Sequence, residues 1–274
     1  MSWNSLAKNF CEGINDGFPE NFNAFTSILF ILPMGMWGLL RSKLRNDLTR
    51  FIYVFLALNG VGSFLLHYYG YRFYGLLDTI TLNLVSWFLN YFVIVIVLNS
   101  IRQKVNISEE ISDKILDLTC LVDMCFCLFF IMNDSVSGKP WGIEVTFAEG
   151  FAICQIFTIL CCIFLCIFHR SNKVFVIYTS VGMVYLLVAV VIWISTEPYC
   201  VKGEDNPKFY DYTHGLWHIF SIHSSHMIIQ SLFYIDVLTK GGKSGYVTSD
   251  NKFMKVIYYL FPIAEEKELL PVTM

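Results

Sequence analysis

The chain has 274 residues, of which 55% are hydrophobic, 17% aromatic and only 15% charged, and its mean hydropathy is +0.56. An average soluble domain has about 25% charged residues, so a water-soluble protein could not cover its surface with so few charges. The net charge of −3 offers no basic patch, which excludes nucleic acid as an expected partner. The composition therefore predicts an integral membrane protein.

Long apolar segments divide the chain into helices that can cross a bilayer, each needing about 20 mainly apolar residues. In chain order, the predicted spans are 22–40, 51–69, 76–98, 115–132, 147–168, 174–195 and 214–238. Short alternating segments typical of a membrane barrel do not occur. The expected fold class is all-α: a polytopic, seven-transmembrane helix bundle that forms one domain over 1–274, with 239–274 as its tail.

The distribution of Lys and Arg predicts the orientation, since basic residues accumulate on the cytoplasmic side. Alternate loops and the C-terminal tail hold 14 of these residues, while the N-terminal segment and the remaining loops hold five. We therefore expect an outer or lumenal N-terminus and a cytoplasmic C-terminus. Segment 1–21 lacks the basic start and cleavage site of a signal peptide and is expected to be retained. A multi-pass protein of this kind belongs in the endoplasmic reticulum or Golgi membrane of a eukaryote, or in a bacterial inner membrane.

The nine cysteines fall into two groups. Seven lie inside apolar spans, where a reduced cysteine behaves as a small hydrophobic residue. Cys11 and Cys200 lie in polar segments on the predicted outer side, where a disulfide can form. Two unpaired thiols are the alternative.

Histidines are concentrated in the spans, where ionisable side chains are costly and each needs a reason. His214 and His218 are four residues apart, about 40° around one helix, so both rings can face one ion. The direction of the second span places His67 at the same depth near the outer face. Three neutral imidazoles with an open fourth position are typical of catalytic zinc, and we predict Zn²⁺ at these residues. Structural histidines held by hydrogen bonds are the alternative.

Two further polar residues, Ser63 and Asp78, are predicted at that same depth. Around them, three blocks of residues stand out. The first is Cys11-Glu12 followed by Gly17-Phe18-Pro19-Glu20-Asn21-Phe22-Asn23, the second is Gly62-Ser63-x-x-x-His67 with Asp78 eleven residues later, and the third is His214-Gly215-x-Trp217-His218. In the order and spacing of these blocks, over nearly its whole length, the chain resembles the alkaline ceramidase family of membrane hydrolases.

The resemblance implies hydrolysis of the N-acyl amide bond of ceramide or a related sphingolipid, giving a sphingoid base and a fatty acid. His67, His214 and His218 would hold Zn²⁺. Asp78 would take a proton from the zinc-bound water and pass it to the leaving amine, and Ser63 would hydrogen-bond the oxyanion. The resemblance also implies a disulfide between Cys11 and Cys200.

A calcium site is a further implication, because eukaryotic members of that family bind Ca²⁺ through the N-terminal segment. Carboxylate and amide oxygens suit this ion. The expected ligands are Glu12 and Glu20, with Asn9, Asn15 and Asp16 as further candidates. The alternative is that Glu20 and Asn23 simply cap the first span.

Three other functions fit parts of the pattern. A receptor of the progestin and adipoQ type has a similar polar set but a cytoplasmic N-terminus, which the basic bias opposes. A membrane lipid esterase or phospholipase would keep the metal and change the substrate. A proton-coupled transporter is the weakest alternative, because the polar residues gather near one face instead of the midplane.

Several polar residues in the spans have no role in this scheme. Asn83, Ser86 and Asn90 are expected to form hydrogen bonds between helices. The sequence leaves the roles of Asp123, His223 and His226 open.

Overall fold

The structure is a computed structural model. It describes residues 10–41, 47–102, 104–105, 108–135, 147–196, 199–200, 207–240, 243–246 and 262–267. Asn9, a candidate calcium ligand, lies outside these residues, as does the side chain of Asp123.

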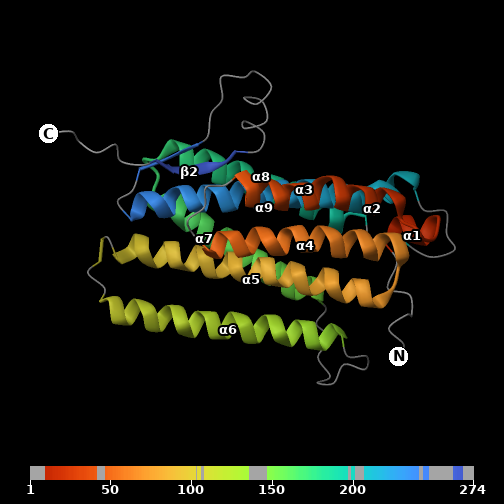
Figure 1. The fold of residues 1–274 in the computed structure, drawn as a ribbon, viewed down its shortest axis with the longest axis horizontal. Helices are drawn as coiled ribbons and strands as arrows, with labels where there is room; N and C mark the ends of the chain where they lie inside the picture. Colours follow the sequence, from red (N-terminus) through yellow and green to blue (C-terminus); the bar gives the residue numbers. More distant parts are fainter. Residues whose placement is uncertain are drawn as a thin grey trace, which may run out of the picture.

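Nearly all of the described chain is helical, and the long helices run side by side in one bundle (Figure 1). The elements are α1 (Cys11–Asn15), α2 (Asn21–Thr26), the π-helix η1 (Ser27–Ile31), α3 (Leu32–Arg41), α4 (Asp47–Tyr69), α5 (Arg72–Arg102), α6 (Glu109–Ser135), α7 (Phe147–Phe168), α8 (Lys173–Ile194), the 3₁₀ helix η3 (Lys208–Tyr212), α9 (Thr213–Thr239), β1 (Lys243–Tyr246) and β2 (Ala264–Lys267). The two short strands pair antiparallel beside α9. The all-α prediction is confirmed.

Five helical segments are long and apolar enough to cross a membrane: Asn21–Leu40, Asp47–Tyr69, Arg72–Arg102, Phe151–Phe168 and Lys173–Ile194. They correspond to predicted spans one, two, three, five and six. The helices α6 and α9, expected as spans four and seven, are 27 residues long but are not among the five. In α9 the reason is physical, because many of its polar side chains face the interior of the bundle and lower its hydropathy. The number of spans therefore remains a prediction.

Polar residues join α5 to α7 within the bundle. Ser86 Oγ accepts a hydrogen bond of 3.1 Å from Gln155 Nε2, and Asn90 Oδ1 accepts one from the Thr158 hydroxyl. These two bonds confirm the expected contacts between helices. The Asn83 amide instead donates to the Thr79 carbonyl of its own helix, at 3.0 Å.

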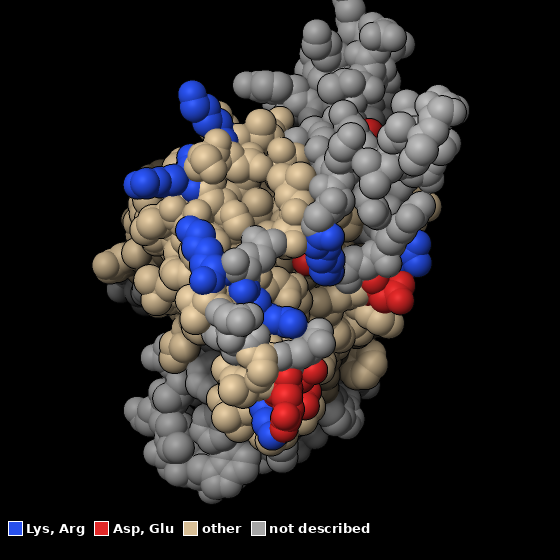
Figure 2. All heavy atoms as spheres, turned by 90° about the vertical axis from the view of Figure 1, so that its left-hand side faces the viewer, with Lys and Arg blue, Asp and Glu red and all other residues tan. Residues whose placement is uncertain are grey.

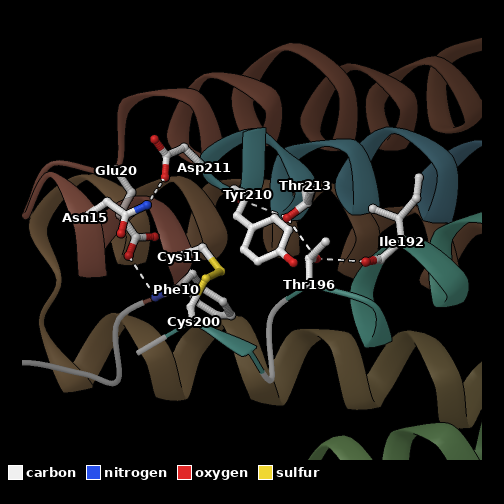
Figure 3. Close-up of a disulfide and its surroundings, with 10 residues drawn as sticks. All are labelled: Phe10, Cys11, Asn15, Glu20, Ile192, Thr196, Cys200, Tyr210, Asp211 and Thr213. Atoms are coloured by element: carbon white, nitrogen blue, oxygen red, sulfur yellow. Dashed lines mark hydrogen bonds between the residues drawn. A yellow bond between two sulfur atoms is a disulfide. The ribbon is translucent and has the colours of Figure 1, made fainter. Parts of the chain in front are cut away.

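A disulfide between Cys11 and Cys200 fastens α1 to the chain segment that leads to α9 (Figure 3). The two Cα atoms are 5.6 Å apart, and 189 positions separate the residues in the sequence. Nearby, the Asn15 amide donates to Asp211 Oδ1 at 2.5 Å, which ties α1 to η3 as well. The N-terminal segment is thus held against the start of α9.

Basic side chains gather at the opposite end of the bundle, where α4, α6 and α8 begin and α5, α7 and α9 end. Figure 2 shows this end, with Lys and Arg spread over its face. The described residues that contribute are Arg50, Arg102, Lys104, Lys114, Arg170, Lys173 and Lys240. This is the end that the sequence assigns to the cytoplasm.

Candidate metal centre

Three buried histidines from two helices meet near the end of the bundle that carries α1. His67 lies in the last turns of α4, while His214 and His218 lie in the first turns of α9. One potential ligand nitrogen from each ring lies within 4.8 Å of the other two. Among the residues that the structure describes, this is the one group of three or more His, Cys, Asp or Glu side chains arranged to hold a metal ion. The sequence predicted these three residues as ligands, and the structure brings them together.

Two glycines let the helices approach closely enough to build this site. A Cβ atom at Gly215 would collide with the ring of Phe22 and lie 3.1 Å from Thr26 Cγ2, so the absent side chain brings α9 against α2. A Cβ atom at Gly62 would lie 3.0 Å from the backbone nitrogen of Asp78, so α4 and α5 also approach closely there. Both glycines belong to the blocks noted in the sequence, and glycine stands at these positions because a side chain would not fit.

His67 is oriented by a buried carboxylate. Glu20 Oε2 lies 2.6 Å from His67 Nδ1, and both side chains are almost fully buried. The other carboxylate oxygen accepts the backbone N–H of Phe10 at 3.0 Å. A carboxylate on one ring nitrogen is the usual partner of a metal-binding histidine. Because Nδ1 is engaged, Nε2 is the nitrogen left for a metal.

His218 is oriented by a hydroxyl group. Its Nδ1 lies 2.9 Å from Thr26 Oγ1, and the Thr26 hydroxyl donates to the Asn23 carbonyl at 2.9 Å. Since that proton is committed to the carbonyl, the hydroxyl oxygen accepts from His218 Nδ1–H. This tautomer leaves Nε2 of His218 unprotonated and able to bind a metal.

The π-helix η1 begins beside this contact, at Ser27. Ser27 Oγ lies 3.4 Å from His218 Nδ1 and 3.0 Å from Ser63 Oγ. In a regular helix, successive residues point about 100° apart, yet Thr26 and Ser27 both reach the site. Short π-helical turns inside helices are frequent at functional sites.

Asp78 and Ser63 border the histidine group. Asp78 is half-buried near the start of α5, and its Oδ1 accepts a 2.9 Å hydrogen bond from Asn59 Nδ2. The Asp78 carboxyl also interacts with the Ser63 hydroxyl and, electrostatically, with His67. The structure therefore gathers all five residues that the sequence placed at one depth.

Sequence reasoning missed the residues that support this group, namely Thr26, Ser27 and Asn59. A signal was present in the first span, where Asn23, Thr26 and Ser27 recur at helical spacing in an otherwise apolar segment. Hydroxyl side chains on one face of a membrane helix indicate a polar partner on its neighbour.

The N-terminal acidic residues have defined structural contacts. Glu12 accepts the backbone N–H groups of Phe22 at 2.7 Å and Asn23 at 3.0 Å, and so caps the start of α2. Burial raises the pKa of the Glu12 carboxyl, against the lowering effect of these two N–H groups. The side-chain cap therefore comes from Glu12, whereas the alternative of a Glu20 cap is not seen because the Glu20 carboxylate contacts His67.

The other described calcium candidates contact η3. Asn15 donates to Asp211, and Asp16 Oδ1 lies 3.0 Å from Lys208 Nζ. The Asp16 and Asp211 carboxylates raise the pKa of Lys208. These contacts do not test Ca²⁺ binding, which stays a prediction.

Two further histidines of α9, whose roles the sequence left open, contact residues outside the centre. His223 Nδ1 bonds to the Ile219 carbonyl of its own helix at 2.8 Å, and His226 contacts Tyr53.

Comparison with known proteins decides which family this arrangement belongs to. The family model described as Ceramidase matches residues 5–260. The chain belongs to the ceramidase family. A search of curated proteins finds no matching sequence. Membership confirms the resemblance seen in the sequence, identifies a hydrolase whose substrate class is ceramide, and does not favour the receptor alternative.

Proposed function

We propose that this ceramidase is a zinc-dependent membrane amidohydrolase that cleaves the N-acyl bond of ceramide-type sphingolipids. The observation that carries the proposal is the buried group of His67, His214 and His218, with ligand nitrogens within 4.8 Å of one another. Imidazole nitrogen is a preferred zinc ligand, and three protein ligands leave a fourth position for chemistry.

The surroundings of the histidines support zinc over a purely structural role. His67 and His218 each have Nδ1 engaged, by Glu20 and Thr26 respectively. Fixed tautomers and a carboxylate partner are what a metal site requires. When bound, the ion supplies Lewis-acid polarisation of the amide carbonyl and lowers the pKa of a water molecule.

Asp78 then transfers the proton, and Ser63 stabilises the carbonyl oxygen. Asp78 is partly accessible, so its carboxylate can accept a proton from the attacking water as the new carbon–oxygen bond forms. It returns this proton to the amide nitrogen when the carbon–nitrogen bond breaks, giving a fatty acid and a sphingoid base. Ser63 donates a hydrogen bond to the carbonyl oxygen as negative charge develops there.

We also propose seven spans, with α6 and α9 crossing the membrane beside the five clear ones. The centre then lies near the outer face, where the polar head of a sphingolipid resides, and the basic end faces the cytoplasm. The disulfide belongs to the oxidising outer side. Protease protection of a tag at the N-terminus tests this orientation.

A calcium site at the N-terminal segment is a second proposal, and it shares Glu20 with the surroundings of the zinc centre. Glu12, Glu20, Asn15 and Asp16 lie within one short stretch of chain that adjoins the centre. Calorimetric titration of the purified protein with Ca²⁺ tests it, with Asp16→Asn as the weakened variant and Asp47→Asn as the control.

The catalytic proposal is tested by fatty-acid release from ceramide and from a diacyl phospholipid in competition. We expect ceramide to be consumed and the phospholipid to be left intact. Preferential release from the phospholipid would instead favour the esterase or phospholipase function. The reaction should also stop in a His67→Ala variant.

A further inference from the structure

A second buried polar cluster lies deeper in the bundle, where it contacts the C-terminal segment 262–264. This cluster consists of Tyr53 on α4 and His226 and Gln230 on α9. Ile263 and Ala264 have no exposed surface, although they follow α9 by more than twenty residues. A stretch from the tail therefore fills space between helices of the bundle.

The contacts form a continuous chain of four hydrogen bonds. Ala264 N–H donates to Gln230 Oε1 at 2.7 Å, and Gln230 Nε2 donates to Tyr53 Oη at 2.6 Å. The Tyr53 hydroxyl oxygen lies 2.9 Å from His226 Nδ1, and His226 Nε2 lies 2.9 Å from the Pro262 carbonyl oxygen.

One assignment of protons satisfies every group in this chain. The Pro262 carbonyl can only accept, so His226 Nε2 carries a proton and donates it. His226 Nδ1 is then an acceptor for the Tyr53 hydroxyl, whose oxygen in turn accepts from Gln230. The cluster therefore offers one acceptor and one donor that match the N–H and C=O of an extended peptide.

This arrangement resembles the way a peptide is bound through its main chain. Both hydrogen bonds between the cluster and the segment go to backbone groups, the Pro262 carbonyl and the Ala264 N–H. Burying these backbone groups without hydrogen-bond partners would be costly. Docking of the segment gives partners both to its own backbone groups and to the polar groups of the cluster.

We propose that Tyr53, His226 and Gln230 form a docking site for the main chain of residues 262–264, which act as a tethered strap between α4 and α9. Both helices also carry the histidine centre, with His226 eight residues after His218, about 12 Å along the helix. The docked strap closes the bundle below the centre, at the half opposite α1. This proposal does not depend on the metal or on the reaction.

Access to the strap can be measured with a membrane-impermeant maleimide on the full-length purified protein. The reporter is an Ile263→Cys variant, with the labelling of protein lacking the reporter subtracted. We expect slow labelling when the rest of the sequence is native. Adding Gln230→Leu should speed labelling about tenfold, because it removes the bonds to Ala264 and Tyr53.

A second variant tests the same bond from the other side. Ala264→Pro removes the backbone N–H that donates to Gln230 Oε1 and leaves the sequence of the bundle helices unchanged. It should speed labelling by a similar factor, and in the Gln230→Leu background it should add nothing. The control is Gln155→Leu, which removes a half-buried amide that joins α7 to α5 and should leave labelling unchanged.

Two results would overturn the strap. Labelling that stays slow in both Gln230→Leu and Ala264→Pro means that the hydrogen bonds do not hold the segment. Equal acceleration by Ala264→Pro in both backgrounds means that the two residues act separately. Neither result bears on zinc content or ceramide hydrolysis, so the strap and the proposed function fail independently.

Discussion

Glu20 Oε2 lies 2.6 Å from Nδ1 of His67, with both side chains buried where α4 meets the start of the first span. This contact joins the N-terminal segment to the centre, since the other oxygen of Glu20 binds the backbone of Phe10. The orientation of a metal-ligand candidate therefore depends on residues outside the helix that carries it.

Replacing Glu20 with Gln should weaken zinc binding about 10- to 100-fold, the range typical for loss of such a partner. Gln keeps the shape but removes the charge that fixes the ring of His67. Competition with a chromogenic chelator measures the affinity. Glu110→Gln, at an exposed residue on α6, is the control and should bind as the native protein does. Equal affinities for both variants would refute this role of Glu20.

Thr26 should act on zinc affinity through the tautomer of His218. Thr26→Val keeps the volume and removes the hydroxyl that accepts from Nδ1, so affinity should fall about tenfold or more. Thr26→Ser restores the oxygen and should recover most of the loss. Competition with the chelator measures the affinity of each variant. If the Ser variant binds zinc as weakly as the Val variant does, the hydroxyl of residue 26 has no role in zinc affinity.

Asp78→Asn should separate proton transfer from metal binding. The variant keeps the hydrogen-bonding shape near Asn59 but cannot accept a proton, so kcat should fall by about 10²–10⁴. Elemental analysis should still find one zinc ion per chain. Asp47→Asn, at an exposed position on α4, is the control for kcat. Native activity in Asp78→Asn would contradict the proton-carrier role.

The parts of this architecture that the sequence predicted are those with a strong local signal. The spacing of His214 and His218 on one face, and the direction of the spans, placed His67 correctly. Helix α9 shows the limit of this reasoning. Its polar residues lower its hydropathy, yet they are buried against other helices, and only the packed bundle reveals those partners.

Tertiary contacts also decided which acidic residue caps α2. Glu12 performs this role, and Glu20 turns to His67 instead. Nothing in the local sequence distinguishes the two carboxylates, because the difference arises from the fold of α1 against α4. The strap of residues 262–264 is a similar case, since its short sequence has no periodic pattern.

The disulfide should contribute to stability without contributing to chemistry. Cys11→Ser should lower the melting temperature in mild detergent, with a loss of about 2 kcal/mol, the low end of the usual range because helices stay inserted when the protein unfolds. Cys125→Ser, at an exposed thiol on α6, should melt as the native protein does. An unchanged melting temperature for Cys11→Ser would argue against the bond.

His169, just beyond α7, predicts a pH dependence of stability. Burial lowers the pKa of its imidazole, as does the nearby Lys104, and His169 Nε2 lies 2.8 Å from Ser100 Oγ. Because the folded-state pKa is below the ordinary value of 6.5, this contribution is complete above pH 6.5 and is lost as pH falls below it. The melting temperature should therefore fall less between pH 7 and pH 5.5 in His169→Asn than in the native protein. An identical fall would contradict this assignment.

We propose that the three histidines hold a zinc ion that the hydrolase needs. Elemental analysis of the purified protein, paired with fatty-acid release from ceramide, tests it most directly in the native chain and in His67→Ala and His218→Ala, with His223→Ala as the matched control. We predict one zinc ion per chain and full activity in the native protein and the control, and loss of both in the other two variants. Native protein that is active without zinc, or a His67→Ala variant that retains full activity, would refute the zinc centre.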